Sequence, residues 1–296
     1  MTTHETFLKE VAGRTGEVFS PVLKALLNLP KEELDYWVGQ KGELSRRLGV
    51  ILKPNWQDAA AISLPTSPFF IKEEVESDRV YPEGYFHRPV CEQLVLLSKH
   101  FTKLDASEIL TCSKDMLPLP PYAEHGFAMP KWQRVGKTYN EAVEFVMEKL
   151  AASRQFKNER ADQLSEKYLR LSERTEEGLA VLGNAYKSDY IILPAQFGFM
   201  HRGRSIRKVC TIYLRHEFGL GPYETGVMLL SHPERLQGKP NELYIDCPGA
   251  EYAPDADGQF VDAPYFHWYG SVLRFYTYWF DDPSSLYGSG SGLLPQ

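Results

Sequence analysis

The most regular pattern of apolar and polar residues in the C-terminal third begins after Ser205. Serine is a residue type that caps helix N-termini, and the apolar side chains that follow recur at the spacing of one helical face. These apolar residues are Ile206, Val209, Cys210, Tyr213 and Leu214. The pattern predicts a helix that buries this face and turns its opposite side to solvent.

A second helix is predicted directly downstream. Gly219 and Gly221 tolerate positive φ and therefore favour a turn, and Pro222 suits the first turn of a helix. The apolar run at 227–230 then ends before Pro233, because a proline disfavours helical geometry in the residue that precedes it. Together the two segments predict an αα-hairpin.

The N-terminal half shows helical periodicity in separate segments. Residues 1–52 contain three short ones, and a capping-box pattern at Asp105 and Glu108 starts another. A further predicted helix buries a stripe formed by Val90, Leu94, Leu97 and Phe101. The proline-rich segment 117–121 cannot continue a helix and is interpreted as a stiff connector.

Two longer helices are predicted in the middle of the chain. Thr138 can cap a helix over 139–153. Apolar positions in 164–186 step by threes and fours, which predicts a long amphipathic helix with a solvated, charged outer face.

Strand signals are fewer. Residues 242–246 and 272–280 are rich in types that suit a pleated surface, and 69–76 is a further candidate strand. The glycine- and serine-rich tail, 287–296, has the composition of a flexible linker, either native or added by engineering.

These patterns predict an α+β fold. We expect a mainly helical portion over 1–188 and a smaller mixed α/β portion over 189–296, which contains the αα-hairpin and an acidic loop. The two portions could share one hydrophobic core.

Composition narrows the class of protein. The 296 residues carry a net charge of −6, so the molecule as a whole is not of the strongly basic type that coats nucleic acid. The four cysteines lie too far apart for a CxxC metal site, and neither a secretory signal nor an apolar membrane span is visible. We therefore expect a cytoplasmic protein that does not enter a membrane.

The strongest functional signal is a basic face on the helix predicted after Ser205. Segment 201–216 has five Lys or Arg residues and no acidic residue. The candidate anion-binding residues are His201, Arg202, Arg204, Arg207, Lys208 and Arg215. Arginine forks beside backbone N–H groups suit phosphate or carboxylate, which makes nucleic acid the first candidate partner and an acidic protein surface the second.

A structural role competes with this functional interpretation. Residues 240–273 contain no Lys or Arg and form an acidic block, within which 242–262 carries six carboxylates. The basic face could simply pair with this block. Aromatic residues in 265–269 and 275–280 could stack on bases, although strand aromatics usually belong to the core.

Two other functions remain open at this point. A hydrolase or transferase could use Cys247 as nucleophile with His232 or His267 as base, or a metal site. The ligand types for such a metal site are present at His201, His232, Asp246 and Glu251, without a tight spacing motif. The third alternative is a purely structural subunit. No motif identifies a cofactor, and the leading hypothesis is a non-enzymatic binding or assembly protein.

Overall fold

The computed structural model describes residues 73–112 and 119–295, without the side chains of 110–112. Contacts within the chain divide it into two units, Met1–Ile71 and Lys72–Gln296. Everything below concerns the second unit. The short helices predicted over 1–52 lie outside the described residues.

The smaller of two sheets has four strands in the order β1-β4-β11-β5, and every neighbouring pair is antiparallel. Its strands are β1 (His125–Pro130), β4 (Tyr190–Gln196), β11 (Ser291–Leu293) and β5 (Glu217–Gly219). All seven residues of β4 are buried. The continuous apolar run that forms this strand is what a strand covered on both faces requires.

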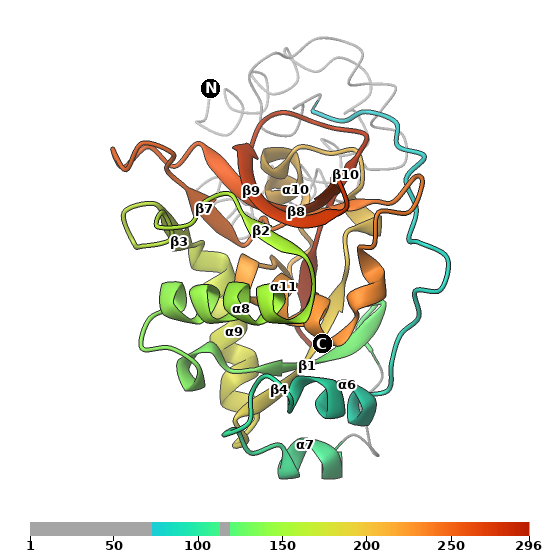
Figure 1. The fold of residues 1–296 in the computed structure, drawn as a ribbon, viewed down its shortest axis with the longest axis vertical. Coiled ribbons are helices and arrows are strands. Elements are labelled where there is room, and N and C mark those ends of the chain that lie inside the picture. Colours follow the sequence, from blue (N-terminus) through green and yellow to red (C-terminus); the bar gives the residue numbers. More distant parts are fainter. Residues whose placement is uncertain (1–72, 113–118, 296) are drawn as a thin grey trace, which may run out of the picture. The chain divides into compact units, whose positions relative to one another are not determined.

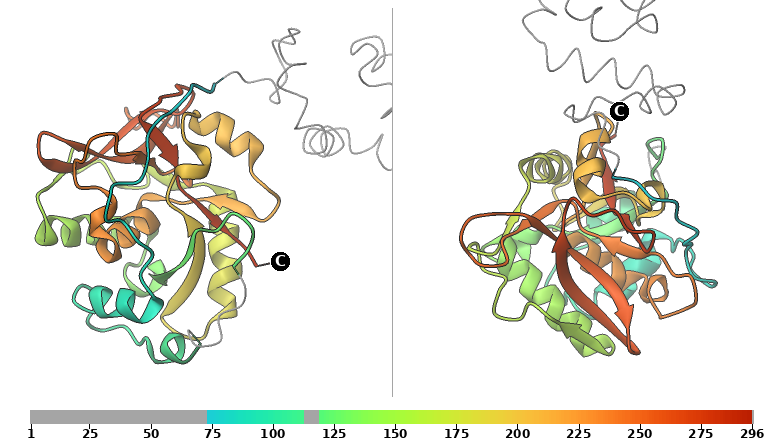
Figure 2. Two further views of the ribbon diagram at one scale, coloured as in Figure 1. Left: turned by 90° about the vertical axis from the view of Figure 1, so that its right-hand side faces the viewer. Right: turned by 90° about the horizontal axis from the view of Figure 1, so that it is seen from above.

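The larger sheet has seven strands. Its two longest strands, β8 (Asp262–Tyr269) and β9 (Val272–Trp279), form a hairpin. The other strands are β2 (Phe156–Asn158), β3 (Leu169–Leu171), β6 (Tyr244–Asp246), β7 (Ala250–Tyr252) and β10 (Tyr287–Ser289). Two pairs, β10 with β6 and β2 with β9, are parallel. The views in Figures 1 and 2 place the β8–β9 hairpin at the end of the unit opposite to α6 and α7.

Six α-helices pack with these sheets in the described residues. They are α6 (Val90–Leu97), α7 (Ser107–Cys112), α8 (Tyr139–Ser153), α9 (Glu173–Ala185), α10 (Ile206–Ile212) and α11 (Pro222–Ser231). Helix α11 is buried along its whole length and packs against α8, α6 and β1 (Figure 1). It is therefore the centre of the core, which explains the apolar run at 227–230, while the buried Glu224 accepts a hydrogen bond from the Tyr139 hydroxyl.

Local signals in two helices are confirmed. Thr138 precedes α8 and its side chain accepts a hydrogen bond from the Glu141 backbone N–H. The predicted stripe on α6 is buried, with Leu97 fully inaccessible. Both predictions rest on neighbouring residues alone, where sequence patterns are most informative.

The predicted fold class is wrong in its distribution of elements. The described residues form a mixed, sheet-rich structure of eleven strands and six helices, and strands β1, β2 and β3 lie before residue 188. Residues on both sides of 188 share one hydrophobic core. Only 173–185 of the long predicted helix is helical, because Leu169–Leu171 pairs with β7 instead. Leucines two apart fit a strand as well as a helix.

The predicted αα-hairpin is also wrong. After α10 the chain forms strand β5, which pairs with β11, before α11 begins. Neither Gly219 nor Gly221 has positive φ. A Cβ at Gly219 would lie 2.5 Å from the Gly249 nitrogen, so this glycine permits a close approach of two backbone segments.

The glycine- and serine-rich tail is not a flexible linker. Residues 287–293 form β10 in the large sheet and then β11 in the small one, and both strands are mostly buried (Figure 2). Small residues are needed here because Phe218 would lie 2.6 Å from a Cβ at Gly292. The tail therefore links the two sheets.

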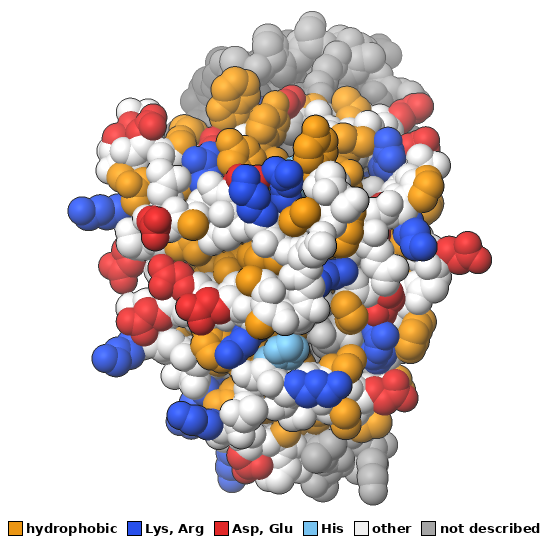
Figure 3. Space-filling model, in the orientation of Figure 1, with side chains coloured by type: hydrophobic (Ala, Val, Ile, Leu, Met, Phe, Trp, Pro, Cys, Tyr) orange, Lys and Arg blue, Asp and Glu red, His pale blue; other side chains and the backbone are white. Residues whose placement is uncertain are grey.

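The surface carries both signs of charge. Figure 3 shows Lys, Arg, Asp and Glu side chains interspersed over the visible face, with hydrophobic side chains gathered toward the end where β8 and β9 lie in Figure 1. Among the described residues, no helix has the length and apolar character that a membrane crossing needs.

Candidate functional site

An extended segment, residues 73–75, lies beside the chain that leads into α10, and we call it the strap. The Val75 N–H donates to the Gly203 carbonyl at 2.7 Å, and the Ser205 N–H donates to the Glu73 carbonyl at 3.0 Å. Ser205 caps α10, since its Oγ accepts from the Lys208 N–H, while the same hydroxyl donates to Glu73 Oε2 at 2.6 Å. A carboxylate of the chain itself therefore occupies the start of the basic helix.

The strap also neutralises two arginines of the basic face. Arg207 Nε donates to both carboxylate oxygens of Glu73, at 3.0 and 3.1 Å, and Nη2 contacts one of them as well. Arg204 forms an ion pair of 3.2 Å with Glu74. Burial works to raise the pKa of Glu73, but the hydrogen bonds from Arg207 and Ser205 outweigh it and lower that pKa. The basic face is thus paired within the chain.

The remaining cations of the basic face differ in their contacts and in their exposure. The guanidinium of Arg202 donates to the Arg79 carbonyl at 2.9 Å and stacks 4.3 Å from the Phe199 ring centroid. Lys208 is half-buried, and Arg215 is exposed beyond the end of α10. The six predicted anion-binding residues therefore do not converge on one open surface.

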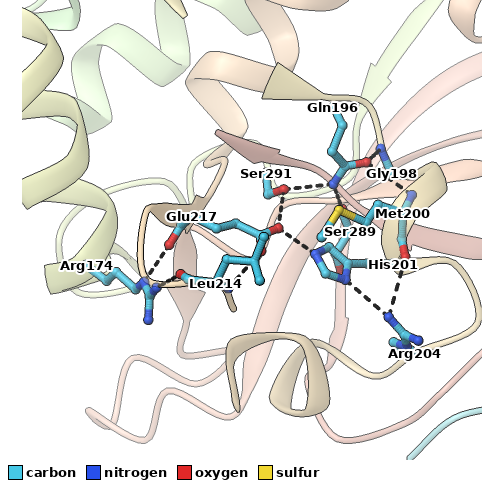
Figure 4. A network of polar contacts seen from close by, with 10 residues as sticks. All are labelled: Arg174, Gln196, Gly198, Met200, His201, Arg204, Leu214, Glu217, Ser289 and Ser291. Atoms are coloured by element: carbon cyan, nitrogen blue, oxygen red, sulfur yellow. Dashed lines mark hydrogen bonds and ion pairs between the residues drawn. The ribbon is translucent and has the colours of Figure 1, made fainter. Parts of the chain in front are cut away.

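His201 belongs to a buried polar network that joins α10 to the small sheet (Figure 4). Its Nε2 lies 2.6 Å from Glu217 Oε1, and Ser291 Oγ donates to the same oxygen at 2.6 Å. The Gln196 amide in turn donates to Ser291 Oγ at 2.9 Å. His201 is 1% exposed, so it fixes the entry of α10 and is not available to a ligand at the surface.

Pairing with the acidic block is the alternative to a free basic face, but Arg204 and Arg207 pair with the strap instead. Within the block, Glu242 accepts hydrogen bonds from the Gln237 and Gly238 N–H groups, and Glu251 pairs with Arg170 at 2.6 Å. The sequence does contain a signal for the strap, because acidic residues at 73, 74, 76 and 78 form a second acidic cluster. Nothing local shows that this cluster meets α10 across 130 residues of chain.

Cys247 does not have the environment of a nucleophile. It is fully buried after β6, and its Sγ lies 3.5 Å from the Thr225 hydroxyl. Burial raises the pKa of its thiol well above the usual value. A reactive cysteine needs the opposite shift, so this thiol behaves as a small core residue.

The two candidate bases lie elsewhere. His232 is fully buried, accepts from the Arg88 N–H at 3.3 Å, and has a pKa lowered to about 3 by burial. His267, on β8, packs edge-on against Tyr244 and Tyr265, and burial lowers its pKa to about 4. No contact joins either ring to Cys247 among the described residues.

The four predicted metal ligands do not meet. His201 pairs with Glu217, His232 contacts Arg88, and Glu251 pairs with Arg170. No group of three or more His, Cys, Asp or Glu side chains in the described part of the chain is arranged to hold a metal ion. Asp246, the fourth candidate, has a different environment that is described below.

A cavity of about 320 Å³ lies between α10 and the acidic block. Its lining residues come from both elements that the sequence singles out. They are Ser172, Ile206, Arg207, Cys210, Thr211, Pro248, Ala250, Glu251, Phe260, Asp262, Ala263 and Phe280. This is the candidate functional site.

Asp262 is the polar group of this cavity whose hydrogen bonding is incomplete. The side chain is 6% exposed, and its Oδ2 accepts from the Thr277 hydroxyl at 3.3 Å. Its Oδ1 has no hydrogen-bond partner. Burial raises the pKa of Asp262, although Thr277 and Arg160 act in the opposite direction. An unpaired buried carboxylate oxygen is costly, so it marks a place where a donor is missing.

The aromatic strand residues are divided between core and surface. Phe266 and Phe275 are fully buried, whereas Tyr269 and Trp279 are 65% and 63% exposed. The β8–β9 register places Tyr269 on the face opposite to these two phenylalanines, whereas Trp279 lies on their face, at the end of β9. Sequence reasoning missed that Asp262 and Asp246 are buried without an ion pair, because only the packed sheet shows which carboxylates of an acidic block remain unpaired.

Comparisons with known proteins supply no further guidance. No protein-family model, no curated protein and no solved structure matches the chain.

Proposed function

We propose that this chain is a non-enzymatic binding protein whose cavity beside α10 holds a small organic ligand that donates a hydrogen bond to Asp262. The observation that carries the proposal is the unpartnered Oδ1 of Asp262, in a side chain that is 6% exposed and lines a cavity of about 320 Å³. That volume is in the range of small-molecule sites, roughly 300 to 1,000 Å³.

The walls of the cavity define the body of the ligand. Phe260 and Phe280 supply aromatic surface, and Ile206, Ala250 and Ala263 supply aliphatic surface. An apolar or aromatic body would replace water against these side chains, which favours binding. A few polar groups in an otherwise apolar cavity then fix the orientation of the ligand.

The charges of the cavity define the polar end of the ligand. Arg207 is paired with Glu73 and lies 3.6 Å from Asp281, and Glu251 is paired with Arg170. Asp262 has neither a cation partner nor a full set of donors. The group that satisfies it is an N–H or O–H donor, and an amine or hydroxyl fits better than an anion.

The same residues argue against chemistry in the cavity. Cys210 lines it, but burial raises the pKa of its thiol to about 11, so little thiolate is present near neutral pH. No histidine is among the described lining residues. A nucleophile without an adjacent base is not activated, and this favours binding over catalysis. We retain the cytoplasm as the expected location.

The test uses three probes that share one ring system. 1-Naphthylmethylamine and 1-naphthalenemethanol carry donors, whereas 1-naphthoate is an anion. We expect the full chain to bind the two donors at least tenfold more tightly than the anion, as measured by naphthalene fluorescence. Asp262→Asn should remove this preference. The control is Glu148→Gln, which removes one carboxylate from an exposed position on α8 and should keep the preference.

Cysteine labelling locates the bound probe. Cys210 lines the cavity, Cys91 lies on α6, and both residues are exposed, so each molecule contains its own control. Saturating naphthylmethylamine should slow alkylation of Cys210 at pH 8.5 severalfold and leave Cys91 unchanged, as measured by peptide mass spectrometry. Equal binding of all three probes, or no protection of Cys210, would refute the proposal.

A further inference from the structure

A second cavity, on the other side of Ile206 and Ala263, contains a different buried carboxylate. It measures about 20 Å³ and is lined by Ile206, Asp246, Ala263, Tyr265, Tyr278, Trp279, Asp282, Ser284 and Tyr287. About one water-sized group fills this volume. The cavity opens beside exposed aromatic side chains, since Trp279 is 63% and Tyr278 46% exposed.

Asp246 is the unsatisfied group of this cavity. It is 8% exposed, and its carboxylate has no hydrogen bond or ion pair with any described residue. Burial alone raises its pKa to about 8, with no neighbouring cation to offset the shift. Ser289 is its partner in the parallel pairing of β10 with β6, and the Ser289 hydroxyl likewise lacks a partner. Paired residues of adjacent strands point to the same face of the sheet.

The groups around Asp246 are aromatic and hydroxylic. Tyr265 lies opposite it on β8, and the Tyr287 ring packs edge-on against Tyr265 with centroids 5.0 Å apart. Both rings remain neutral, because burial raises the pKa of Tyr265 to about 12 and that of Tyr287 further. The other ionisable groups of the cavity are Tyr278 and Asp282, joined by a 2.9 Å hydrogen bond.

We propose that Asp246 and its aromatic walls bind the head group of a primary alkylammonium ion. An ammonium supplies both the missing positive charge and three N–H donors. Aromatic faces attract cations, and the attraction grows when the cation is desolvated. A cavity of about 20 Å³ accepts –NH₃⁺ and excludes a quaternary ammonium. The alkyl chain then leaves along the exposed surface of Trp279 and Tyr278.

This ligand chemistry has two sources, a free amine and a lysine side chain of another polypeptide. The two cavities share Ile206 and Ala263 and both accept an amine, but each depends on a different carboxylate, so Asp246→Asn and Asp262→Asn distinguish the two sites. Failure of one proposal therefore leaves the other intact.

The test titrates the full chain with n-butylammonium, an N-acetylated and amidated lysine tripeptide, and tetramethylammonium at pH 8.5. We expect saturable binding of the two primary ammonium probes and at least a tenfold weaker response to tetramethylammonium, followed by tryptophan fluorescence. Tighter binding of the tripeptide assigns the site to a polypeptide partner, whereas equal binding assigns it to a free amine.

The pH dependence separates this site from a merely structural carboxyl group. Binding must displace the proton of Asp246, so the apparent affinity should fall roughly tenfold per pH unit below about 8. Calorimetry in two buffers of different ionisation enthalpy should detect the released proton at pH 7. Above the amine pKa, about 10.4 for a lysine side chain, the affinity should fall again.

Two variants complete the test. Asp246→Asn should lose binding of n-butylammonium, while Asp255→Asn, an exposed aspartate in the same acidic block, should keep it. Trp279→Ala keeps the carboxylate and should weaken binding severalfold, which provides a second readout if Asp246→Asn does not fold. Binding that survives Asp246→Asn, equal binding of tetramethylammonium, or no binding up to 100 mM probe would overturn the proposal. A dissociation constant at this limit corresponds to a binding free energy of about −1.4 kcal/mol.

Discussion

At the scale of single residues, charge compensation separates the carboxylates near α10 into two groups. Glu73 and Glu251 each face an arginine, at Arg207 and Arg170. Asp246 and Asp262 are more deeply buried and face none within hydrogen-bonding distance in the described residues. Burial of these two groups without a partner is unfavourable for folding, and a ligand that pairs with them offsets this desolvation cost.

A pH-dependent stability difference follows for Asp246. Its pKa is raised from 3.8 to about 8 in the folded protein, so folding favours the protonated form. Its contribution to stability is therefore full below about pH 4 and declines as the pH rises through 8. We expect Asp246→Asn to gain stability relative to wild type as the pH rises from about 4 to 8, on the order of 5 kcal/mol in total.

Urea unfolding at pH 4, 6 and 8 measures this difference. Glu224, whose pKa burial raises to about 7, also titrates in this pH range. Because both proteins contain Glu224, its contribution cancels in the difference between their unfolding free energies. The neighbouring Tyr265 and Tyr287 stay neutral throughout. A difference that does not change with pH would show that Asp246 is not buried as a lone carboxyl group.

At the scale of elements, α10 depends on the strap. The helix has seven residues, too few to be stable by itself. It is held by the Ser205 cap, by backbone hydrogen bonds between the strap and residues 203 and 205, and by the ion pairs of Glu73 and Glu74. The strap thus stabilises the helix and screens its positive charge.

Removal of the two strap carboxylates should create the anion site that the sequence alone predicts. We expect wild type to bind fluorescent oligo-dT weakly at low salt, and Glu73→Gln with Glu74→Gln to bind it about tenfold more tightly, because Arg204 loses its carboxylate partner and Arg207 keeps only the 3.6 Å contact with Asp281. That binding should weaken steeply as salt rises. Fluorescence anisotropy provides the measurement.

The matched control is Glu76→Gln with Asp78→Asn, which removes the same charge from exposed neighbours. It should leave oligo-dT binding near that of wild type. The strap variant should also unfold at a lower urea concentration. We expect its free energy of unfolding to fall by only about 1 kcal/mol, because Arg207 is partly exposed. Tight oligo-dT binding by wild type, abolished by Arg207→Glu, would contradict this account of the strap.

At the scale of the whole second unit, the last strands connect the two sheets. β10 pairs with β6 in the large sheet, and β11 lies between β4 and β5 in the small one. Ser291 of β11 also supplies a hydrogen bond to Glu217 in the network around His201. The segment at 287–293 is therefore part of the core.

Loss of this segment should abolish cooperative folding. We expect deletion of 287–296 to remove the sigmoidal thermal transition followed by circular dichroism, whereas deletion of Pro295 and Gln296 alone should shift it little. A point substitution tests the same packing, because Gly292→Val would place Cβ 2.6 Å from Phe218. It should cost about 1 to 3 kcal/mol.

Gly183→Ala provides the control for that substitution. Gly183 lies in α9, and nothing lies within 4 Å of a Cβ added there. Alanine has the higher helix propensity, so this variant should gain up to about 1 kcal/mol. A chain that unfolds cooperatively without residues 287–296 would show that the tail is dispensable.

The sequence by itself determined what short-range physics controls. Thr138 as a cap, the buried stripe from Val90 to Phe101 and the strand at 272–279 follow from spacing and residue type. Each depends on neighbours within one element, where side-chain periodicity and hydrogen-bond geometry leave few alternatives.

The tertiary structure alone decided how these elements meet and which charges remain unpaired. Glu73 reaches Arg207 across 134 positions, and a tail with the composition of a linker becomes two buried strands. Asp246 and Asp262 look like other members of an acidic block until the sheet buries them without an ion pair. Burial and pairing are properties of long-range packing, which residue spacing does not encode.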